Sequence, residues 1–410
     1  MAGLRARTVP IDGAPDLLSE AGETGYLWLE DGGDGLAANG VAATIDLPSG
    51  LSDPAGVQAA FEALRTVESE DQVGLPGCGP VAIGALPFDP GAAGHLVVPR
   101  RLIGRSGGRA WMTTIEGGPI DDAHPVQAPG SPPDHFTLTS SMPQSDWKAV
   151  VSAALDAIKR GELRKVVLAR RVDITANRPF VVSDVLARLA ALYPSCMVFS
   201  VEGFLGASPE LLIRRSGHSV ESHPLAGTVA RSGSQRSDDA LAAGLLSSPK
   251  ARHEHQVVVD ELRSALEGVC SQLDVPDRPS VLALRNVSHL GTRITGRLAP
   301  PAPGERLPSA LDLVARVHPT PAVAGTPTDA AIRYAGEVEG FDRGRYTGPV
   351  GWVDARGDGA FAVGIRCAET SGARARIYAG NGVVEGSDPD EELAETQLKL
   401  QALLAALVRP

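Results

Sequence analysis

A hairpin-like segment in the last third of the chain places the strongest constraint on the fold. Residues 348–367 read GPVGWVDARGDGAFAVGIRC, so two apolar runs flank a short polar segment that contains glycine. This pattern is typical of two antiparallel strands joined by a tight turn. Helical patterns alternate with strand-like segments elsewhere, and we therefore predict interleaved helices and strands with antiparallel pairing.

The remaining elements are predicted from periodicity and from residues that start or stop helices. The helix that begins at Pro249 has the clearest signals, because Ser248 can cap it and Gly268 follows its last turn. A C-terminal helix opens at Asp388–Pro389. Residues 117–135 are rich in Pro, Gly and Asp and are predicted to be a loop or linker. Other helices are expected at 54–68, 145–161 and 182–194, and strands at 163–174, 197–204, 359–370 and 375–383.

Charge and composition exclude several classes of function. The formal net charge is −11, from 38 Lys and Arg against 49 Asp and Glu. No nucleic acid and no membrane surface is therefore expected as a partner, since both need clustered positive charge. No apolar run is long enough to cross a membrane and the N-terminus lacks a secretory pattern, so a cytoplasmic protein is expected. The four cysteines form no CxxC pair, which predicts neither a zinc knuckle nor a disulfide framework. A small anionic substrate requires a site that gathers its own positive charge.

Two helices carry carboxylates that could bind a metal. Glu392, Glu395 and Lys399 share one face of the C-terminal helix, although a solvated face with a Glu395–Lys399 surface pair is the simpler interpretation. In the helix that begins at Pro249, Glu254 lies on the same face as an apolar stripe that includes Val258. A buried carboxylate needs a cation partner, and a hard divalent ion held by a few carboxylates is the pattern of Mg²⁺.

Two cations lie in strand-like segments. Strand alternation places Lys165 on one face with Val167 and Ala169. A lysine among small apolar neighbours can act as a neutral base, although most strand lysines lie at a solvated edge. Arg366 is predicted to share a strand face with the small residues Ala362, Gly364 and Ala368. That arrangement leaves room for a carboxylate ligand on the sheet; an interstrand salt bridge is the alternative.

Two glycine-containing segments could offer backbone N–H groups to an anion. The first is AGNGVVEG (379–386), predicted to follow a strand and lacking the glycine spacing of a dinucleotide fingerprint. The second is LAGT (225–228), predicted to be a turn in which Thr228 supplies a hydroxyl group.

The order of these motifs resembles the chorismate-utilising enzyme family. The resemblance covers about residues 145–408 and is specific because ten short motifs occur in family order, whereas the first 140 residues match loosely. These motifs are KVVLAR (165–170), GASPELLI (206–213), HPLAGT (223–228), RHEHQVVVDE (252–261), NVSHL (286–290), HPTPAVAG (318–325), GPVGW (348–352), GIRCAE (364–369), AGNGVVEGSDP (379–389) and ELAETQLK (392–399).

The resemblance implies an α+β fold, a single large domain in which two stacked, mainly antiparallel β-sheets carry helices outside. Residues 1–140 would be a variable N-terminal part of this unit, and residues 141–410 the chorismate-binding catalytic core. Such a core needs no partner subunit, so a monomer is expected. Family members often have an acid three residues before Glu254, where this chain has Ala251, so one outer contact to the metal is expected to be missing or taken by water.

The resemblance also implies the roles of individual residues. Glu254 and Glu395 would bind Mg²⁺, with Glu392 as a supporting carboxylate. His289 would lie against the substrate ring. The substrate's carboxylates would be held by Arg366, Lys399, Thr228 and the backbone of Gly227 and Gly380, with Tyr346 beside them. Lys165, Arg366, Lys399 and the metal would together supply the positive charge that a dianionic substrate requires.

The nucleophile separates the members of this family. Lys165 is similar to the lysine of the water-using members, whereas anthranilate synthases carry Gln there. The resemblance therefore implies isochorismate synthesis: Lys165 takes a proton from the water that attacks C2, and Glu210 gives one to the departing C4 hydroxyl. This needs a neutral amine and a protonated carboxyl group at rest. The product fits either menaquinone or siderophore biosynthesis.

Four other functions are less consistent with the sequence than isochorismate synthesis. Salicylate synthases share Lys165 and Glu210 but eliminate pyruvate, and they tend to carry Thr near Ala322, so Ala322 favours the isomerase. An ammonia-using synthase is disfavoured by Lys165. A non-catalytic chorismate-binding protein is disfavoured by the retained acid, base and metal positions, and a nicotinamide oxidoreductase would rest on the glycine cluster alone.

Overall fold

The computed structural model describes residues 1, 3–118 and 130–408. Strands make up much of this chain, and they have the following bounds: β1 (Arg5–Ile11), β2 (Tyr26–Leu29), β3 (Gly35–Leu47), β4 (Glu68–Asp71), β5 (Val81–Ala85), β6 (Gly94–Ser106), β7 (Arg109–Glu116), β8 (Phe136–Ser140), β9 (Lys165–Ala176), β10 (Met197–Val201), β11 (Phe204–Ser208), β12 (Leu211–Ser216), β13 (Ser219–His223), β14 (Leu225–Ala230), β15 (Cys270–Asp274), β16 (Ser280–Ala283), β17 (Val287–Gly291), β18 (Ile294–Leu298), β19 (Gly325–Thr326), β20 (Pro349–Asp354), β21 (Gly359–Val363), β22 (Cys367–Ser371) and β23 (Arg374–Val384).

The helices lie between these strands along the chain. They are α1 (Leu17–Ala21), α2 (Pro54–Arg65), α3 (Gln144–Lys159), α4 (Val182–Leu192), α5 (Gln235–Ser247), α6 (Pro249–Glu267), α7 (Ala310–Val317), α8 (Thr328–Val338) and α9 (Pro389–Leu407), with short 3₁₀ turns η1 (Asp31–Gly33) and η2 (Gly50–Ser52). None of the helices in the described part of the chain has the length and apolar character that a membrane crossing requires.

The strands form one large hydrogen-bonded network and one small sheet. Within the described residues, twenty strands belong to the network, which includes the order β8–β9–β23–β22–β11–β10–β2–β3–β6–β5–β20–β21–β12–β13–β18–β15. Among the pairs of described strands, only β1 and β4 are parallel. The small sheet is β14–β17–β16. Strands of the first 140 residues pair directly with strands of the later part of the chain, as in β2–β10 and β5–β20, so the chain folds as a single α+β unit.

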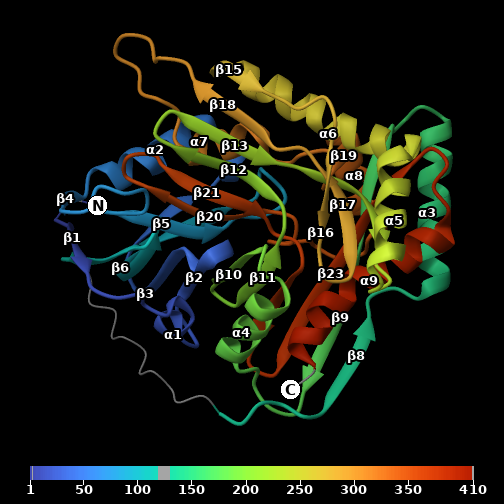
Figure 1. Ribbon diagram of the computed structural model, residues 1–410, viewed down its shortest axis with the longest axis horizontal. Helices are drawn as coiled ribbons and strands as arrows, with labels where there is room; N and C mark the ends of the chain where they lie inside the picture. Colours follow the sequence, from blue (N-terminus) through green and yellow to red (C-terminus); the bar gives the residue numbers. More distant parts are fainter. Residues whose placement is uncertain (2, 119–129, 409–410) are drawn as a thin grey trace.

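The network folds back so that two halves face each other, with helices outside (Figure 1). An inner cluster takes side chains from both halves, including Trp28, Phe199, Phe204 and Trp352. On one outer face α2, α6 and α7 pack on the sheet, and on the other α1, α4 and α9 do so. This layering explains why strands of both halves are apolar on both faces: each is covered by the opposite half inside and by helices outside.

The hairpin at residues 348–367 is confirmed, because β20 and β21 pair in antiparallel register. The capped helix is confirmed too: the Ser248 side chain accepts a hydrogen bond from the Ala251 N–H, and Pro249 occupies the first turn. The strand predicted at 197–204 is in fact interrupted, since β10 and β11 form a tight hairpin around Glu202 and Gly203, and both of these residues have positive φ. Of the predicted linker 117–135, residues 119–129 lie outside the described part, and 130–135 form no helix or strand.

Candidate active site

A cavity of about 850 Å³ lies between the small sheet, β23 and helices α5, α6 and α9. The part of β23 that faces it is the segment 378–384, which pairs with β9 on one side and extends beyond β22 on the other. Within the described chain its wall is built from residues at or after Val167, so none comes from the first 140 residues. All positions with a predicted role line this cavity except Lys165, which contacts it through Glu254. The lining positions are Glu210, Gly227, Thr228, Glu254, His289, Ala322, Tyr346, Arg366, Gly380, Glu392, Glu395 and Lys399.

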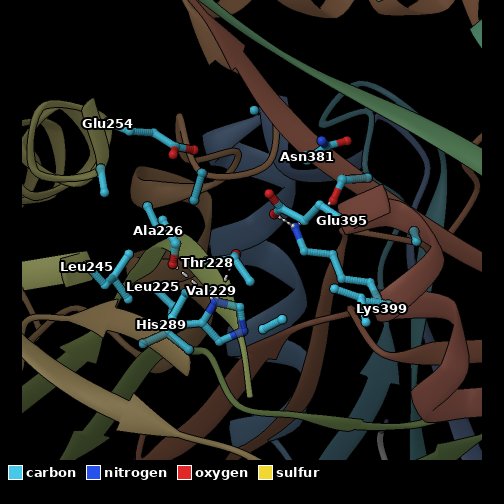
Figure 2. A pocket seen from close by; sticks show the side chains of 18 of the residues that line it. Leu225, Ala226, Thr228, Val229, Leu245, Glu254, His289, Asn381, Glu395 and Lys399 are labelled. Atoms are coloured by element: carbon cyan, nitrogen blue, oxygen red, sulfur yellow. Dashed lines mark hydrogen bonds and ion pairs between the residues drawn. The ribbon is translucent and has the colours of Figure 1, made fainter. Parts of the chain in front are cut away.

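Helices α6 and α9 bring the predicted metal ligands to the cavity. In Figure 2, Glu254 extends from α6 toward the side of the cavity where Glu395 and Lys399 lie on α9. The helix α9 begins where the Asp388 side chain accepts hydrogen bonds from two backbone N–H groups, so Glu392 and Glu395 fall within its first two turns. The positive end of the helix dipole favours acidic residues there.

Each of the three carboxylates pairs with a lysine. The resulting ion pairs are Lys165–Glu254 at 3.0 Å, Lys250–Glu392 at 3.4 Å and Lys399–Glu395 at 2.7 Å. The first pair is nearly enclosed, with side chains 3% and 15% exposed. Burial alone would raise the pKa of Glu395, but Lys399, the Thr228 hydroxyl and Arg366 together bring it below its ordinary value. The positive charge that an acidic protein needs for an anionic substrate is therefore gathered at this cavity.

The carboxylates that line the cavity are the donor type that suits a hard divalent cation, although their spacing in this structure is wider than that of a metal site. Among the residues that the structure describes, no three acidic, histidine or cysteine side chains converge closely enough to hold a metal ion. The carboxylates nevertheless influence one another: burial raises the pKa of Glu392, and the negative charges of Glu395 and Glu254 raise it further. Mutual repulsion among oxygen donors is relieved by a divalent cation, and carboxylate oxygens are the ligands that Mg²⁺ prefers.

Gly382 makes room for the Lys165–Glu254 pair. A Cβ atom at this position would lie 2.6 Å from Glu254 Oε1 and 2.6 Å from Lys165 Cε, which is closer than such atoms approach. Both contacted atoms are at the ends of side chains, so a methyl group here would displace the ion pair rather than the backbone. The pair thus depends on glycine at 382.

We expect Gly382→Ala to lower kcat/KM by about 10²-fold, since a displacement of about 1 Å in catalytic groups has an effect of that size. The melting temperature should change little, because side chain ends can move. Steady-state kinetics and thermal unfolding of the same preparation measure both quantities. Gly336→Ala in α8, where a Cβ would meet nothing within 4 Å, is the matched control. Near-normal activity of Gly382→Ala would show that the position of this pair is unimportant.

Glu210 is a carboxyl group that is protonated at neutral pH. It lies between β11 and β12, is 4% exposed, and is next to Ser208, whose hydroxyl accepts a hydrogen bond from the Glu210 N–H. Burial raises the pKa of Glu210 to about 8, although the Leu225 N–H and the charges of Lys165 and Lys399 oppose the shift. A neutral carboxyl group can donate a proton into the cavity.

The prediction for Arg366 was wrong about its backbone. The strand expected at 359–370 is broken between β21 and β22, and Arg366 has a φ of 49°, in the left-handed region. It therefore does not share a strand face with Gly364 and Ala368. The kink turns its side chain toward the small sheet, where Arg366 Nη2 lies 3.1 Å from His289 Nε2. The guanidinium still lines the cavity, but a turn rather than a pleat positions it.

His289 is neutral in this environment. It is 6% exposed on β17, and burial, with the charges of Arg366 and Lys399, lowers its pKa well below the ordinary value. Because Arg366 can only donate, Nε2 of His289 accepts and Nδ1 carries the hydrogen. Nδ1 lies 3.3 Å from Gly227 O and 3.1 Å from Thr228 Oγ1, so the ring fixes both residues of β14.

Both glycine segments proved to be parts of strands rather than a loop and a turn. Residues 379–384 continue β23, and 225–228 begin β14, where a bulge gives Gly227 a φ of 73°. The strand predicted at 375–383 is confirmed in this longer form. Such a bulge requires glycine and exposes the backbone to the cavity.

The backbone of β23 is nevertheless open on the cavity side. Val167 and Ala169 of β9 donate their N–H groups away from β23, and their ladder partners are Gly382 and Gly380. In an antiparallel pair, two opposite residues either exchange backbone hydrogen bonds or both direct their N–H and C=O groups away from the partner strand. The N–H and C=O groups of Gly380 and Gly382 therefore point away from β9, toward the cavity. Lys399 Nζ donates to Gly380 O there at 2.8 Å.

Tyr346 and Ala322 complete the wall. Tyr346 is 4% exposed and stacks on Tyr378, with ring centroids 4.9 Å apart. Ala322 belongs to a segment that is attached to β9 by Arg343, which donates to Val323 O and to Val167 O. A stacked tyrosine ring and the methyl group of Ala322 thus form this part of the cavity wall.

Sequence reasoning missed two residues that hold Glu392. Asn381, 3% exposed, donates from Nδ2 to Glu392 O at 3.0 Å and also to its carboxylate. Lys250 pairs with the other carboxylate oxygen. Lys250 could have been found, because it precedes Glu254 by four residues on the same helical face. Asn381 lies within a quoted motif, but nothing in its spacing predicts the contact.

Comparisons with known proteins agree with this geometry. A family model described as chorismate binding enzyme matches residues 120–408. The isochorismate synthase DhbC of Bacillus subtilis is 38% identical over 358 residues, which cover 84% of this chain and 84% of that protein. The structure of DhbC from Bacillus anthracis matches with a TM-score of 0.80 at 34% identity, covering 95% and 98% of the two chains. MenF, the menaquinone-specific isochorismate synthase of Escherichia coli, matches with a TM-score of 0.81 at 27% identity, covering 99% and 95%.

Proposed function

Because this chain belongs to the chorismate-binding enzyme family, we propose that it converts chorismate into isochorismate. One observation carries the proposal: a protonated carboxyl group, Glu210, lines the cavity, and a buried lysine, Lys165, contacts the same cavity through Glu254. This is the acid and base pair that a hydroxyl transfer between two ring carbons requires. DhbC of Bacillus subtilis and MenF of Escherichia coli, which match 84% and 99% of the chain, bear this activity in their names.

The reaction exchanges one hydroxyl for another without net loss of atoms. In its neutral form, released from the ion pair with Glu254, Lys165 takes a proton from a water molecule whose oxygen bonds to C2 of the ring. The ring double bonds shift as the C4–O bond breaks. Glu210 gives its proton to the departing hydroxyl, which leaves as water. One water enters and one leaves, so the product is an isomer of the substrate.

We assign the substrate's carboxylates to the cationic and N–H donors of the cavity. Arg366 and Lys399 supply charge, and Thr228 with the backbone of Gly227 and Gly380 supplies hydrogen bonds. His289 and Tyr346 lie against the ring. All of these groups come from one chain, which is the basis for proposing an active monomer.

Mg²⁺ is proposed as the cofactor, held by Glu254 and Glu395 with Glu392 in support. When bound, the ion withdraws electron density from the ring through the C1 carboxylate. The donor type and the mutual repulsion of the three carboxylates support this assignment. In taking up the ion, Glu254 and Glu395 would exchange their lysine partners for it.

Salicylate synthesis is the second candidate, because Lys165 and Glu210 serve its first step equally well. It needs a further elimination of pyruvate. The methyl group of Ala322, rather than a polar side chain, lines the cavity at the position that separates the two activities. This favours release of intact isochorismate.

A test of the nucleophile separates this proposal from the ammonia-using members of the family. With chorismate, Mg²⁺ and an excess of ammonium, neither anthranilate nor aminodeoxychorismate should form, because Lys165 selects water. Chromatography with fluorescence detection measures both products. Formation of either one at a rate comparable to that of isochorismate would contradict the assignment of water.

A further inference from the structure

We propose that Lys250 sets the affinity of this site for a divalent cation, because its ammonium group pairs with Glu392 and must give way when the metal binds. The inference rests on the proposed function, in which Glu254, Glu392 and Glu395 surround Mg²⁺. It adds a residue that has no task in the proposed reaction. Lys250 acts through Glu392 and is therefore a positioning residue.

Glu392 is held from two sides. Lys250 Nζ lies 3.4 Å from one carboxylate oxygen, and the Asn381 amide donates to the other oxygen and, at 3.0 Å, to the backbone carbonyl. The Glu392 side chain is 5% exposed, so it has no room to turn away. The carboxylate therefore stays beside the metal position whether or not its lysine partner is present.

Lys250 is the most exposed of the three lysines in this arrangement. Its side chain is 41% exposed, whereas those of Lys165 and Lys399 are 3% and 15% exposed. It stands in the first turn of α6, one turn before Glu254, and its long stem reaches Glu392 along the cavity wall. Its ammonium group can move from Glu392 into solvent, but its position one turn before Glu254 on α6 keeps the charge near the carboxylates of the site.

The charges explain why this exchange matters for the metal. The three carboxylates of the site are balanced by three lysines, and two of those lysines have roles toward water or substrate. A divalent ion that enters beside Glu392 meets the third lysine as a like charge. By Coulomb's law, a unit charge ~6 Å from a divalent ion in a water-like medium weakens binding roughly tenfold. Ala251, the next residue, supplies no acid to offset this effect.

The experiment is a titration of the full-length, metal-free protein with Mg²⁺ alone, followed by calorimetry, so that no turnover is involved. Lys250→Met should bind Mg²⁺ roughly tenfold more tightly than the wild type. Lys250→Arg keeps the charge and should match the wild type. Lys148→Met is the matched control, because Lys148 is 39% exposed and pairs with Asp390 at the start of α9, outside the cavity wall. Its affinity should stay within about twofold of the wild type.

Two results would overturn the inference in different ways. Equal or weaker Mg²⁺ binding by Lys250→Met would show that Lys250 supports Glu392 rather than competing with the metal, and would leave the proposed function intact. If the wild type bound no Mg²⁺ even with chorismate present, the metal assignment in the proposed function would fall together with the inference. Thermal unfolding of each variant establishes that the comparison is between folded proteins.

Discussion

Replacing Lys165 by alanine, or Glu210 by glutamine, lowers kcat by at least ~10²-fold in this account, while chorismate binding changes far less. Each substitution removes one proton transfer and leaves the substrate's carboxylate donors in place. Glu210→Gln is the cleaner of the two, since glutamine keeps the shape of the side chain and cannot donate an acidic proton. Steady-state kinetics give kcat, and equilibrium binding to an inactive variant gives the affinity.

The raised pKa of Glu210 predicts how the activity depends on pH. Burial raises the pKa of Glu210 to about 8, so the group is protonated below that pH and can act as an acid. As pH rises through about 8 the proton is lost, and kcat/KM should fall tenfold per further pH unit. This decline should be absent from the residual activity of Glu210→Gln.

Lys159→Ala, which removes an exposed lysine at the end of α3, is the control for the Lys165→Ala variant. If Lys165→Ala kept near-normal kcat, the base would be another group.

Removal of the metal should abolish turnover. EDTA is expected to stop the reaction and added Mg²⁺ to restore it, because in the proposed function the ion would anchor the substrate and neutralise the carboxylates around it. Glu254→Ala and Glu395→Ala should each be inactive while still folded. Glu254→Gln belongs in the same set, since alanine leaves the buried Lys165 without its partner and can lower stability.

Glu267→Ala is the control for these metal variants, because Glu267 is exposed at the far end of α6. It should retain normal activity and the same response to EDTA. Activity measured before and after chelation, with circular dichroism of each variant, separates loss of metal from loss of fold. Full turnover in metal-free buffer would contradict the metal assignment.

Local signals predicted much of the secondary structure. The start of α6 follows from the Ser248 side chain and Pro249, and the start of α9 follows from Asp388, because a helix cap is decided by three or four adjacent residues. The β20–β21 hairpin follows for the same reason. The family resemblance located the residues of the cavity wall, and the structure brings them around one space.

What could not be predicted depends on contacts between distant segments. Arg366 adopts a left-handed conformation that alternation in the sequence cannot reveal, because its backbone carbonyl is fixed by a hydrogen bond from the Ala207 N–H in β11. The pairing of Lys250 with Glu392 joins residues 142 positions apart. The glycines of 379–384 look like a loop in sequence, yet the ladder with β9 makes them a strand.

The most direct test of the central claim is chromatography of the products in both directions. Incubation of chorismate with the protein and Mg²⁺ should yield isochorismate, and supplied isochorismate should yield chorismate, until both mixtures reach the same composition. Moving a hydroxyl between two ring carbons changes little in bonding, so an equilibrium constant near unity is expected. Pyruvate, assayed separately, should stay at background. Stoichiometric pyruvate with salicylate at neutral pH would contradict this account and identify a salicylate synthase instead.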